Sequence, residues 1–231
     1  MNVVGVVCAL AAEARHLTPL ADGTLLAVSG MGMAAASQSA QALVEAGAGA
    51  LVSWGMAGGL DPALVAGTVF LPSEVVAAEG VVLSTASHWR ERLSMAVRTQ
   101  PATTLPIILQ GRLLTSPKAI GSLSEKAALF QQTGAAAVDM ESLAIAEIAH
   151  THQLPFIAIR VIVDSAGDTL PRAVTAAADS EGHLQVWRLM GALARAPADL
   201  PPLMRLARRY RAANRSLAAI AKVGSLARYI S

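Results

Sequence analysis

The sequence predicts a single-domain α/β fold in which helices flank a central mixed sheet. Short apolar runs alternate with segments of helical composition along the chain, which is the order expected of strands and helices that pack in layers. Hydrophobic residues make up 54% of the 231 residues, whereas aromatic residues make up 3% and charged residues 15%. This composition is typical of a tightly packed helix and sheet interior rather than of disorder.

The first quarter of the chain is predicted to form three strands with two helices between them. The strands are apolar runs bounded by turn residues, and the helices are longer segments of helical composition. In chain order, we predict a strand over 2–8, a helix over 12–20, a strand over 24–29, a helix over 34–45 and a strand over 50–54.

The rest of the chain continues the alternation. Residues before a proline disfavour helical conformation, so a helix is expected to end before Leu154-Pro155. We predict an extended segment over 69–76, a helix over 88–98, a proline-containing stretch over 101–118 with a strand near Ile107, a helix over 124–132, a strand over 136–139, a helix over 141–152, a strand over 156–163, and helices near 180–196 and from 202 onward.

Two acids follow predicted strands, and one helix separates them. Apolar residues run up to Asp139, just before Glu141, and up to Asp164, as expected of buried parallel strands. Glu141 and Asp164 should therefore lie at the carboxyl edge of one sheet, where open α/β folds bind ligands. The alternative is structural, because Glu141 can favour a helix N-terminus and Asp164 can cap a loop.

Two glycine clusters are candidate ligand loops. The first, Gly30-Met31-Gly32-Met33-Ala34-Ala35, follows a strand and opens a helix, as a dinucleotide fingerprint does. The next strand should then end in an acid for the ribose, but it runs into the second cluster, Trp54-Gly55-Met56-Ala57-Gly58-Gly59. This omission argues against a nicotinamide or flavin enzyme, and we expect no cofactor.

Other catalytic templates have little support. His150 and His152 lie two apart on a predicted helix and point to different faces, so we expect no metal site. No serine has the surroundings of a nucleophile elbow. Cys8 is predicted to be a core residue, and a single cysteine excludes an internal disulfide. With no recognisable signal peptide or membrane span, a cytoplasmic location is predicted.

The carboxyl-terminal segment is strongly basic. From residue 200 onward there are seven Lys or Arg and no acid, which leaves eleven bases and sixteen acids, a net charge of −5, in the remainder. Apolar residues recur there at near-helical spacing. Three interpretations are open: a helix packed on the body with a solvated basic face, peripheral contact with anionic lipid, and, with the least support, nucleic acid. The apolar stripe comprises Leu203, Leu206, Tyr210, Leu217 and Ile220.

Several motifs, taken in order, carry a family resemblance over roughly residues 3–170. They are Cys8-Ala9-Leu10-Ala11-Ala12-Glu13, Ser29-Gly30-Met31-Gly32, Gly55-Met56-Ala57-Gly58-Gly59-Leu60, Val138-Asp139-Met140-Glu141 and Val163-Asp164-Ser165-Ala166. The chain resembles the nucleoside phosphorylase and nucleosidase superfamily, especially its methylthioadenosine/adenosylhomocysteine nucleosidase branch. Its Asp-Met-Glu-Ser sequence, its Gly167–Pro171 ending and its basic tail are similar to the hopanoid-biosynthesis-associated phosphorylase group.

The resemblance implies a role for each site residue. Asp164 matches the aspartate that protonates or hydrogen-bonds purine N7, and Glu141 matches the glutamate that binds the ribose hydroxyls. Met140 matches a residue packed against the sugar. Glu13 matches the glutamate that activates the attacking water, and Gly58 would lie by the base.

The chain also departs from the nucleosidase pattern. Met56 and Val163 replace serines, which makes the predicted site more apolar. Arg15 and Arg160 do not occupy the recognised phosphate positions, so hydrolysis is favoured over phosphorolysis. The family's adenine-contacting loop is not recognisable around Leu114 to Ile120.

The resemblance therefore implies an N-ribosyl hydrolase that releases adenine from a 5′-substituted adenosine, with adenosylhopane as the preferred substrate. The alternatives are phosphorolysis of the same bond, a general methylthioadenosine/adenosylhomocysteine nucleosidase, and a non-catalytic nucleoside-binding module. The superfamily implies at least a homodimer. We predict a catalytic domain over 1–200 and a basic amphipathic helix over 201–231.

Overall fold

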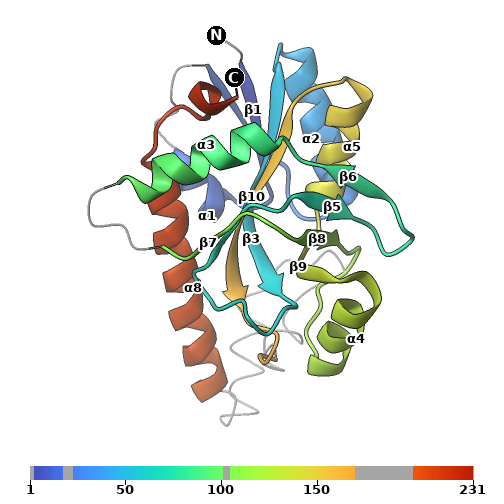
Figure 1. Ribbon diagram of the computed structural model, residues 1–231, viewed down its shortest axis with the longest axis vertical. Coiled ribbons are helices and arrows are strands. Elements are labelled where there is room, and N and C mark those ends of the chain that lie inside the picture. Colours follow the sequence, from blue (N-terminus) through green and yellow to red (C-terminus); the bar gives the residue numbers. More distant parts are fainter. Residues whose placement is uncertain (1–2, 18–22, 101–104, 170–199, 231) are drawn as a thin grey trace.

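The computed structural model describes residues 3–17, 23–100, 105–169 and 200–230, and it has the predicted α/β architecture (Figure 1). The helix predicted near 180–196 lies outside the described residues, as does the end of the one predicted over 12–20. The strands are β1 (Val4–Cys8), β2 (Thr24–Val28), β3 (Ala50–Gly59), β4 (Val69–Phe70), β5 (Glu74–Val76), β6 (Val82–Ser84), β7 (Ile107–Ile108), β8 (Arg112–Thr115), β9 (Ala135–Asp139) and β10 (Phe156–Asp164).

Within the described residues these strands form one mixed ten-stranded sheet. Its main path runs β6-β5-β8-β9-β3-β10-β4-β7, and β1 pairs with β2 and β3. The long strand β10 runs parallel to β3, whereas β9 runs antiparallel to it. The prediction of a central mixed sheet is therefore confirmed.

The helices cover both faces of the sheet (Figure 1). On one face α2 packs beside α5, and on the other lie α3, α8 and the short helix η3. Alternate residues of β10 enter the two cores: Ile157 and Ile159 face the α3 and α8 side, while Ala158 faces the α2 and α5 side. The helices are α1 (Ala11–Ala14), η1 (Arg15–Leu17), α2 (Met33–Glu45), α3 (Ser87–Arg98), α4 (Leu123–Thr133), α5 (Ser142–Thr151), α8 (Leu200–Ala221) and η3 (Leu226–Tyr229).

Three sequence predictions about strands need correction. The strand expected to stop at Trp54 continues through the glycine cluster to Gly59. The extended segment over 69–76 is two strands, β4 and β5. Strand β8 lies in the stretch where only a strand near Ile107 was expected. In each case tertiary pairing decides what the local pattern leaves open, since β5, for example, is held between β6 and β8.

The prediction that Glu141 and Asp164 lie at one carboxyl edge of parallel strands needs correction. Strands β9 and β3 are antiparallel and overlap only at their carboxyl-terminal ends, where Val138 pairs with Gly58. On the other side of β3, Asp164 of β10 also pairs with Gly58. The ends of β9 and β10 therefore converge on the end of β3 from both sides.

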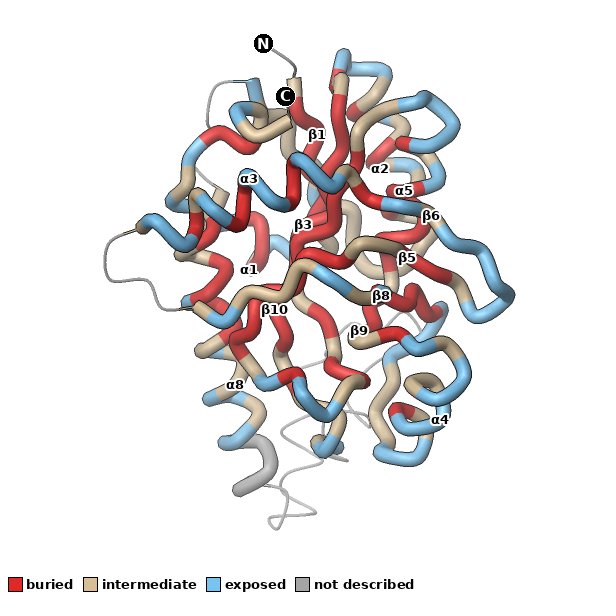
Figure 2. The backbone as a smooth tube through the Cα atoms, viewed as in Figure 1, coloured by how far each residue is buried: buried red, intermediate tan, exposed pale blue. Residues whose placement is uncertain are grey.

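Helix α8 packs the second half of its apolar stripe on the body of the protein. Leu217 and Ile220 are fully buried against the sheet, a burial worth about 1.5–3 kcal/mol for each side chain. These two side chains are therefore not available to lipid, and the predicted peripheral contact with anionic lipid stays a prediction. Figure 2 shows exposed residues along the outer side of the helix. Among the described residues, no helix has both the length and the apolarity needed to cross a bilayer.

Candidate active site

A cavity of about 290 Å³ opens where the ends of β3, β9 and β10 converge. All seven residues predicted for the site line it: Glu13, Met56, Gly58, Met140, Glu141, Val163 and Asp164. A larger cavity, of about 620 Å³, borders α2 and α5 and contains none of the seven. The structure thus brings the predicted residues together, while the role of each stays a prediction.

The glycines of β3 let the acids approach the strand. A Cβ on Gly55 would lie 2.7 Å from Glu13 Oε1, and one on Gly58 would lie 3.1 Å from Asp164 Oδ1. A Cβ on Gly59 would lie 2.9 Å from the backbone oxygen of Asp164. The glycine cluster is therefore a strand that two carboxylates approach closely, rather than a ligand loop.

Glu13 is held by backbone donors. Its Oε1 accepts a hydrogen bond from Met56 N at 2.9 Å, and its Oε2 accepts one from Leu10 N at 3.2 Å. Burial raises the pKa of the Glu13 carboxyl, and the positive charge of Arg160 and the two backbone donors oppose that rise. A side chain placed in this way can orient a water molecule at the cavity and take its proton.

The end of β9 carries two acids with different contacts, Asp139 and Glu141. Asp139 accepts hydrogen bonds from Ser142 N, at 3.2 and 3.4 Å, at the start of α5. Glu141 makes no such cap and instead accepts a hydrogen bond from Gly32 N at 3.0 Å. Burial, together with the negative charge of Asp139, raises the pKa of Glu141 to about 7. Glu141 is the N-cap residue of α5, but the side chain that accepts hydrogen bonds from the start of this helix is that of Asp139.

The end of β10 shows a similar difference between two acids. Asp168 closes the following loop by accepting hydrogen bonds from Ser165 N at 2.9 Å and Ser165 Oγ at 2.7 Å. Asp164 is left facing the cavity, where it forms an ion pair with Lys126. Burial raises the pKa of the Asp164 carboxyl, although the adjacent Lys126 charge opposes the effect. The loop-capping interpretation therefore applies to Asp168 rather than to Asp164.

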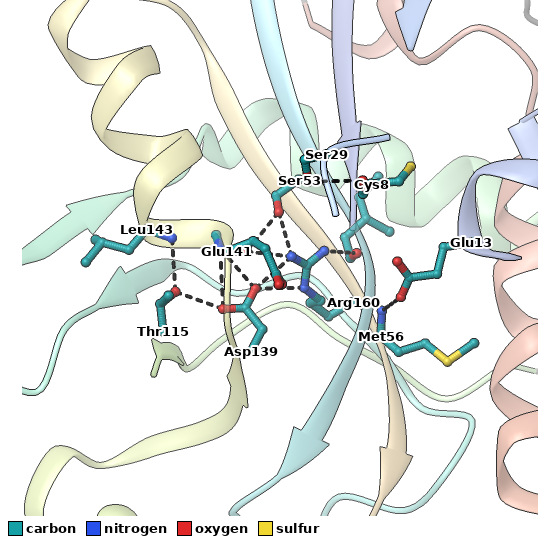
Figure 3. Close-up of polar contacts among 12 residues, drawn as sticks. Cys8, Glu13, Ser29, Ser53, Met56, Thr115, Asp139, Glu141, Leu143 and Arg160 are labelled. Atoms are coloured by element: carbon teal, nitrogen blue, oxygen red, sulfur yellow. Dashed lines mark hydrogen bonds and ion pairs between the residues drawn. The ribbon is translucent and has the colours of Figure 1, made fainter. Parts of the chain in front are cut away.

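Arg160 forms the centre of a buried polar network that sequence reasoning did not find. Its Nη2 donates to Asp139 Oδ2 at 2.7 Å, to Ser53 Oγ at 2.6 Å and to Ser142 Oγ at 3.0 Å. Figure 3 shows its guanidinium with Asp139 on one side and Glu13 on the other. The available signal was an arginine inside the apolar run Phe156–Asp164, because a buried charge requires a buried partner.

Other lining residues were also missed. Lys118, Ala119 and Ile120 line the cavity, although the sequence around them shows no recognisable base-contacting loop. Tyr210 of α8 lines it too, so the basic helix contributes to the site. In the dinucleotide-like loop, Gly32 has a φ of 97° and its backbone N–H donates the hydrogen bond to Glu141. Cys8 is fully buried in the core, as predicted, and burial raises its thiol pKa.

Comparison with known proteins identifies a family. The sequence matches the family described as the Phosphorylase superfamily over residues 13–192. This match confirms the resemblance to nucleoside phosphorylases and nucleosidases. No curated protein sequence matches the chain.

Solved structures with the same fold include bacterial nucleosidases. The 5′-methylthioadenosine/S-adenosylhomocysteine nucleosidase of Helicobacter pylori is similar, with a TM-score of 0.68 and 15% identity, over 96% of each chain. That of Campylobacter jejuni gives a TM-score of 0.66 and 14% identity, over 87% of this chain and 97% of its own. The futalosine hydrolase of Helicobacter pylori gives 0.64 and 15%, over 90% and 97% respectively.

Proposed function

The chain belongs to the Phosphorylase superfamily, and we propose that it is the enzyme that hydrolyses the N-ribosyl bond of a 5′-substituted adenosine and releases adenine. The observation that carries this proposal is the meeting of Glu13, Glu141 and Asp164 on one largely apolar cavity. The similar solved structures include a nucleosidase named for 5′-methylthioadenosine and S-adenosylhomocysteine, both 5′-substituted adenosines, and a futalosine hydrolase, and this supports the choice.

Asp164 is the leaving-group acid in this proposal. Its buried position favours the protonated carboxyl, which gives its proton to adenine N7 as the bond to the ribose breaks. The base then departs as a neutral molecule. Gly58 lies against the same carboxyl and leaves room for the base.

Glu141 binds the ribose. Its carboxylate accepts hydrogen bonds from the 2′- and 3′-hydroxyls and favours the positive charge that grows on the sugar. Met140, next to it in the lining, packs against the sugar. This role requires the ionised form, so with a pKa of about 7 for Glu141 substrate binding weakens as the pH falls below neutrality.

Glu13 activates the water that attacks C1′. The water's oxygen forms the new bond to C1′, and its proton passes to the Glu13 carboxylate. Among the described lining residues the only basic side chain is Lys118, which pairs with Glu125 on the surface at 3.0 Å. A carboxylate at the attacking end repels a phosphate dianion and suits a water molecule, which favours hydrolysis over phosphorolysis.

Product analysis tests the reaction type. Purified enzyme and methylthioadenosine or adenosylhopane are incubated in phosphate-free buffer and again with phosphate. We expect the same rate of adenine release in both, with free sugar as the second product. A ribose 1-phosphate product that appears only with phosphate would establish phosphorolysis instead. Bound nucleoside without any product would favour a non-catalytic binding module.

For the substrate we propose adenosylhopane, which places a large hydrocarbon on the 5′ side. Met56 and Val163 line the cavity where the family has serines, and Leu10 and Tyr210 add further apolar surface. Burying hydrocarbon there is worth about 0.8 kcal/mol for each methylene. We expect a higher kcat/KM for long apolar 5′ substituents than for adenosylhomocysteine. Equal values would favour a general methylthioadenosine/adenosylhomocysteine nucleosidase.

We also propose that the protein is a cytoplasmic homodimer in peripheral contact with anionic membranes. The outer face of α8 exposes Arg205, Arg208, Arg211 and Arg215, while Leu217 and Ile220 are packed inward. Attraction to lipid is therefore electrostatic rather than insertive. Salt-sensitive sedimentation with phosphatidylserine vesicles tests it, and Arg205, Arg208 and Arg211 changed together to Gln should abolish it. Analytical ultracentrifugation tests the dimer.

A further inference from the structure

Lys126 is a lysine in an unusual place. Its side chain is 1% exposed, although it lies near the start of α4, a helix whose other described residues are exposed or half-buried. Lysine is almost never fully buried without a partner, because removing an ammonium group from water costs several kcal/mol. A helix held only by packing would bury an apolar residue at this position. The buried ammonium therefore points to a task at its partner.

The partner is the carboxyl group assigned above to the leaving base. Lys126 Nζ donates to Asp164 Oδ2 and to the backbone oxygen of Ser165, the latter at 2.8 Å. The other carboxyl oxygen, Oδ1, lies toward Gly58, which lines the cavity. Lys126 itself does not line the cavity, so it reaches the reaction only through Asp164.

We propose that Lys126 is a positioning residue for Asp164. Its ammonium donates a hydrogen bond to Oδ2, so that the protonated oxygen of the Asp164 carboxyl is Oδ1, which faces the leaving base. This inference rests on the proposed function. When the proton leaves Oδ1, the O–H bond breaks, an N–H bond forms at N7, and the carboxylate that remains is paired with the ammonium. The ammonium therefore stabilises the negative charge that appears on Asp164 as the bond to the ribose breaks.

The same pair adjusts the acidity of Asp164. Burial raises its pKa, and the Lys126 charge holds that rise in check. An acid is most effective when its pKa lies near the working pH, so too large a rise would weaken proton transfer. In the described part of the chain, the other charged groups near this carboxyl are Asp168 and Arg209, and Lys118, Glu13, Asp139 and Glu141 line the same cavity. Because Arg209 is paired with Asp168 at 2.6 Å, Lys126 is, among the residues that the structure describes, the cation in direct contact with Asp164.

The experiment compares pH profiles of kcat for soluble adenosine analogues. Activity requires protonated Asp164, so it falls as the pH rises through the pKa of that carboxyl. Lys126→Met keeps the length of the side chain and removes its charge. In this variant we expect the fall in kcat at high pH, the alkaline limb of the profile, to shift to higher pH by about one pH unit or more, which is the usual effect of losing a charge in contact. We expect kcat to be reduced roughly 3- to 10-fold and KM to change less than 3-fold.

Two further variants separate charge from packing. Lys126→Arg retains a positive charge and should return the limb toward its wild-type position. Phe130→Ala loosens the packing of α4 without touching the pair, so it should lower the unfolding midpoint and leave the limb in place. If Lys126→Met does not fold, Lys126→Gln, which keeps a donor without the charge, is read in the same way.

The outcomes distinguish this inference from the function on which it rests. A folded, active Lys126→Met enzyme with an unmoved limb would overturn the role of Lys126 and leave the nucleosidase proposal intact. A wild-type enzyme that releases no base from any of the nucleosides would overturn both. A limb that moves equally in Phe130→Ala would show that α4 packing, not the charge, sets the pH range.

Discussion

The two ends of the cavity hold their acids in opposite ways. At the ribose end, the buried cation Arg160 pairs with Asp139, the structural acid, and the hydrogen bond that Glu141 accepts from the described residues comes from the backbone N–H of Gly32. At the base end, the buried cation Lys126 pairs directly with Asp164, while Asp168 closes the loop. The position of the cation, rather than the position of the acid, therefore decides which carboxyl carries an uncompensated charge.

The largest effect expected is on stability, from Arg160→Met. Removing this guanidinium leaves Asp139 buried without its charged partner, and we expect the free energy of unfolding to fall by about 3–5 kcal/mol. Urea denaturation at pH 7 measures it. As a matched control, Arg112→Met breaks an exposed pair with Glu74 and should lower the free energy by less than about 1 kcal/mol. Equal losses would mean that the buried network adds nothing special.

Asp164→Asn should lower kcat by about 100-fold or more, with KM nearly unchanged, because leaving-group protonation acts in the transition state. Steady-state kinetics with methylthioadenosine measures both constants. Circular dichroism serves to check that the variant is folded. A kcat near the wild-type value in a folded variant would remove Asp164 from the acid role and leave the base end without a function for its ion pair.

Glu141→Gln should reveal the uncompensated charge at the ribose end. The pKa of Glu141 is about 7 in the folded protein and 4.5 in the unfolded chain, so folding keeps the carboxyl protonated to a higher pH. The stability contributed by this carboxyl is therefore present below about pH 4.5 and lost as the pH rises through 7. The difference between the two pKa values lowers the free energy of unfolding by as much as about 3 kcal/mol above pH 7.

The variant lacks this penalty, so it should be more stable than wild type at pH 8 and equal to it near pH 4.5. Thermal unfolding at the two pH values measures the difference. Activity should change in the opposite direction, with a higher KM and a lower kcat, because Glu141 holds the ribose before and during bond cleavage. A stability difference that does not depend on pH would mean that Glu141 is already ionised in the folded protein.

Asp168→Ala should have the smallest effect. It removes two hydrogen bonds to Ser165 and an ion pair with Arg209 at the surface of the loop. We expect a loss of about 1–2 kcal/mol in unfolding free energy, and a fall in kcat of less than 10-fold. If kcat fell as far as in Asp164→Asn, the division of tasks between the two acids would be wrong.

The sequence identified residues that lie together at one cavity, several of them at strand ends, while their roles stay predictions. Glu141 and Asp164 follow apolar runs, and the ordered motifs add Glu13, Met56, Gly58, Met140 and Val163, all of which line one cavity. Residues of this kind are visible because a strand end leaves a local pattern. Lys126 leaves none, since a lysine near the start of a polar helix is normally exposed, and only the docking of α4 reveals its burial.

The α/β class, most helix positions and the family could be recognised in the amino-acid sequence, because hydrophobic periodicity and short motifs are visible without knowing which distant residues are in contact. Three features became visible in the folded protein alone: β9 runs antiparallel to β3, the glycine cluster is a strand, and α8 packs Leu217 against the sheet. The tertiary structure alone also placed Arg160 and Lys126 beside their acids. Strand direction, docking and charge pairing depend on contacts between residues far apart in the chain, which no local pattern encodes.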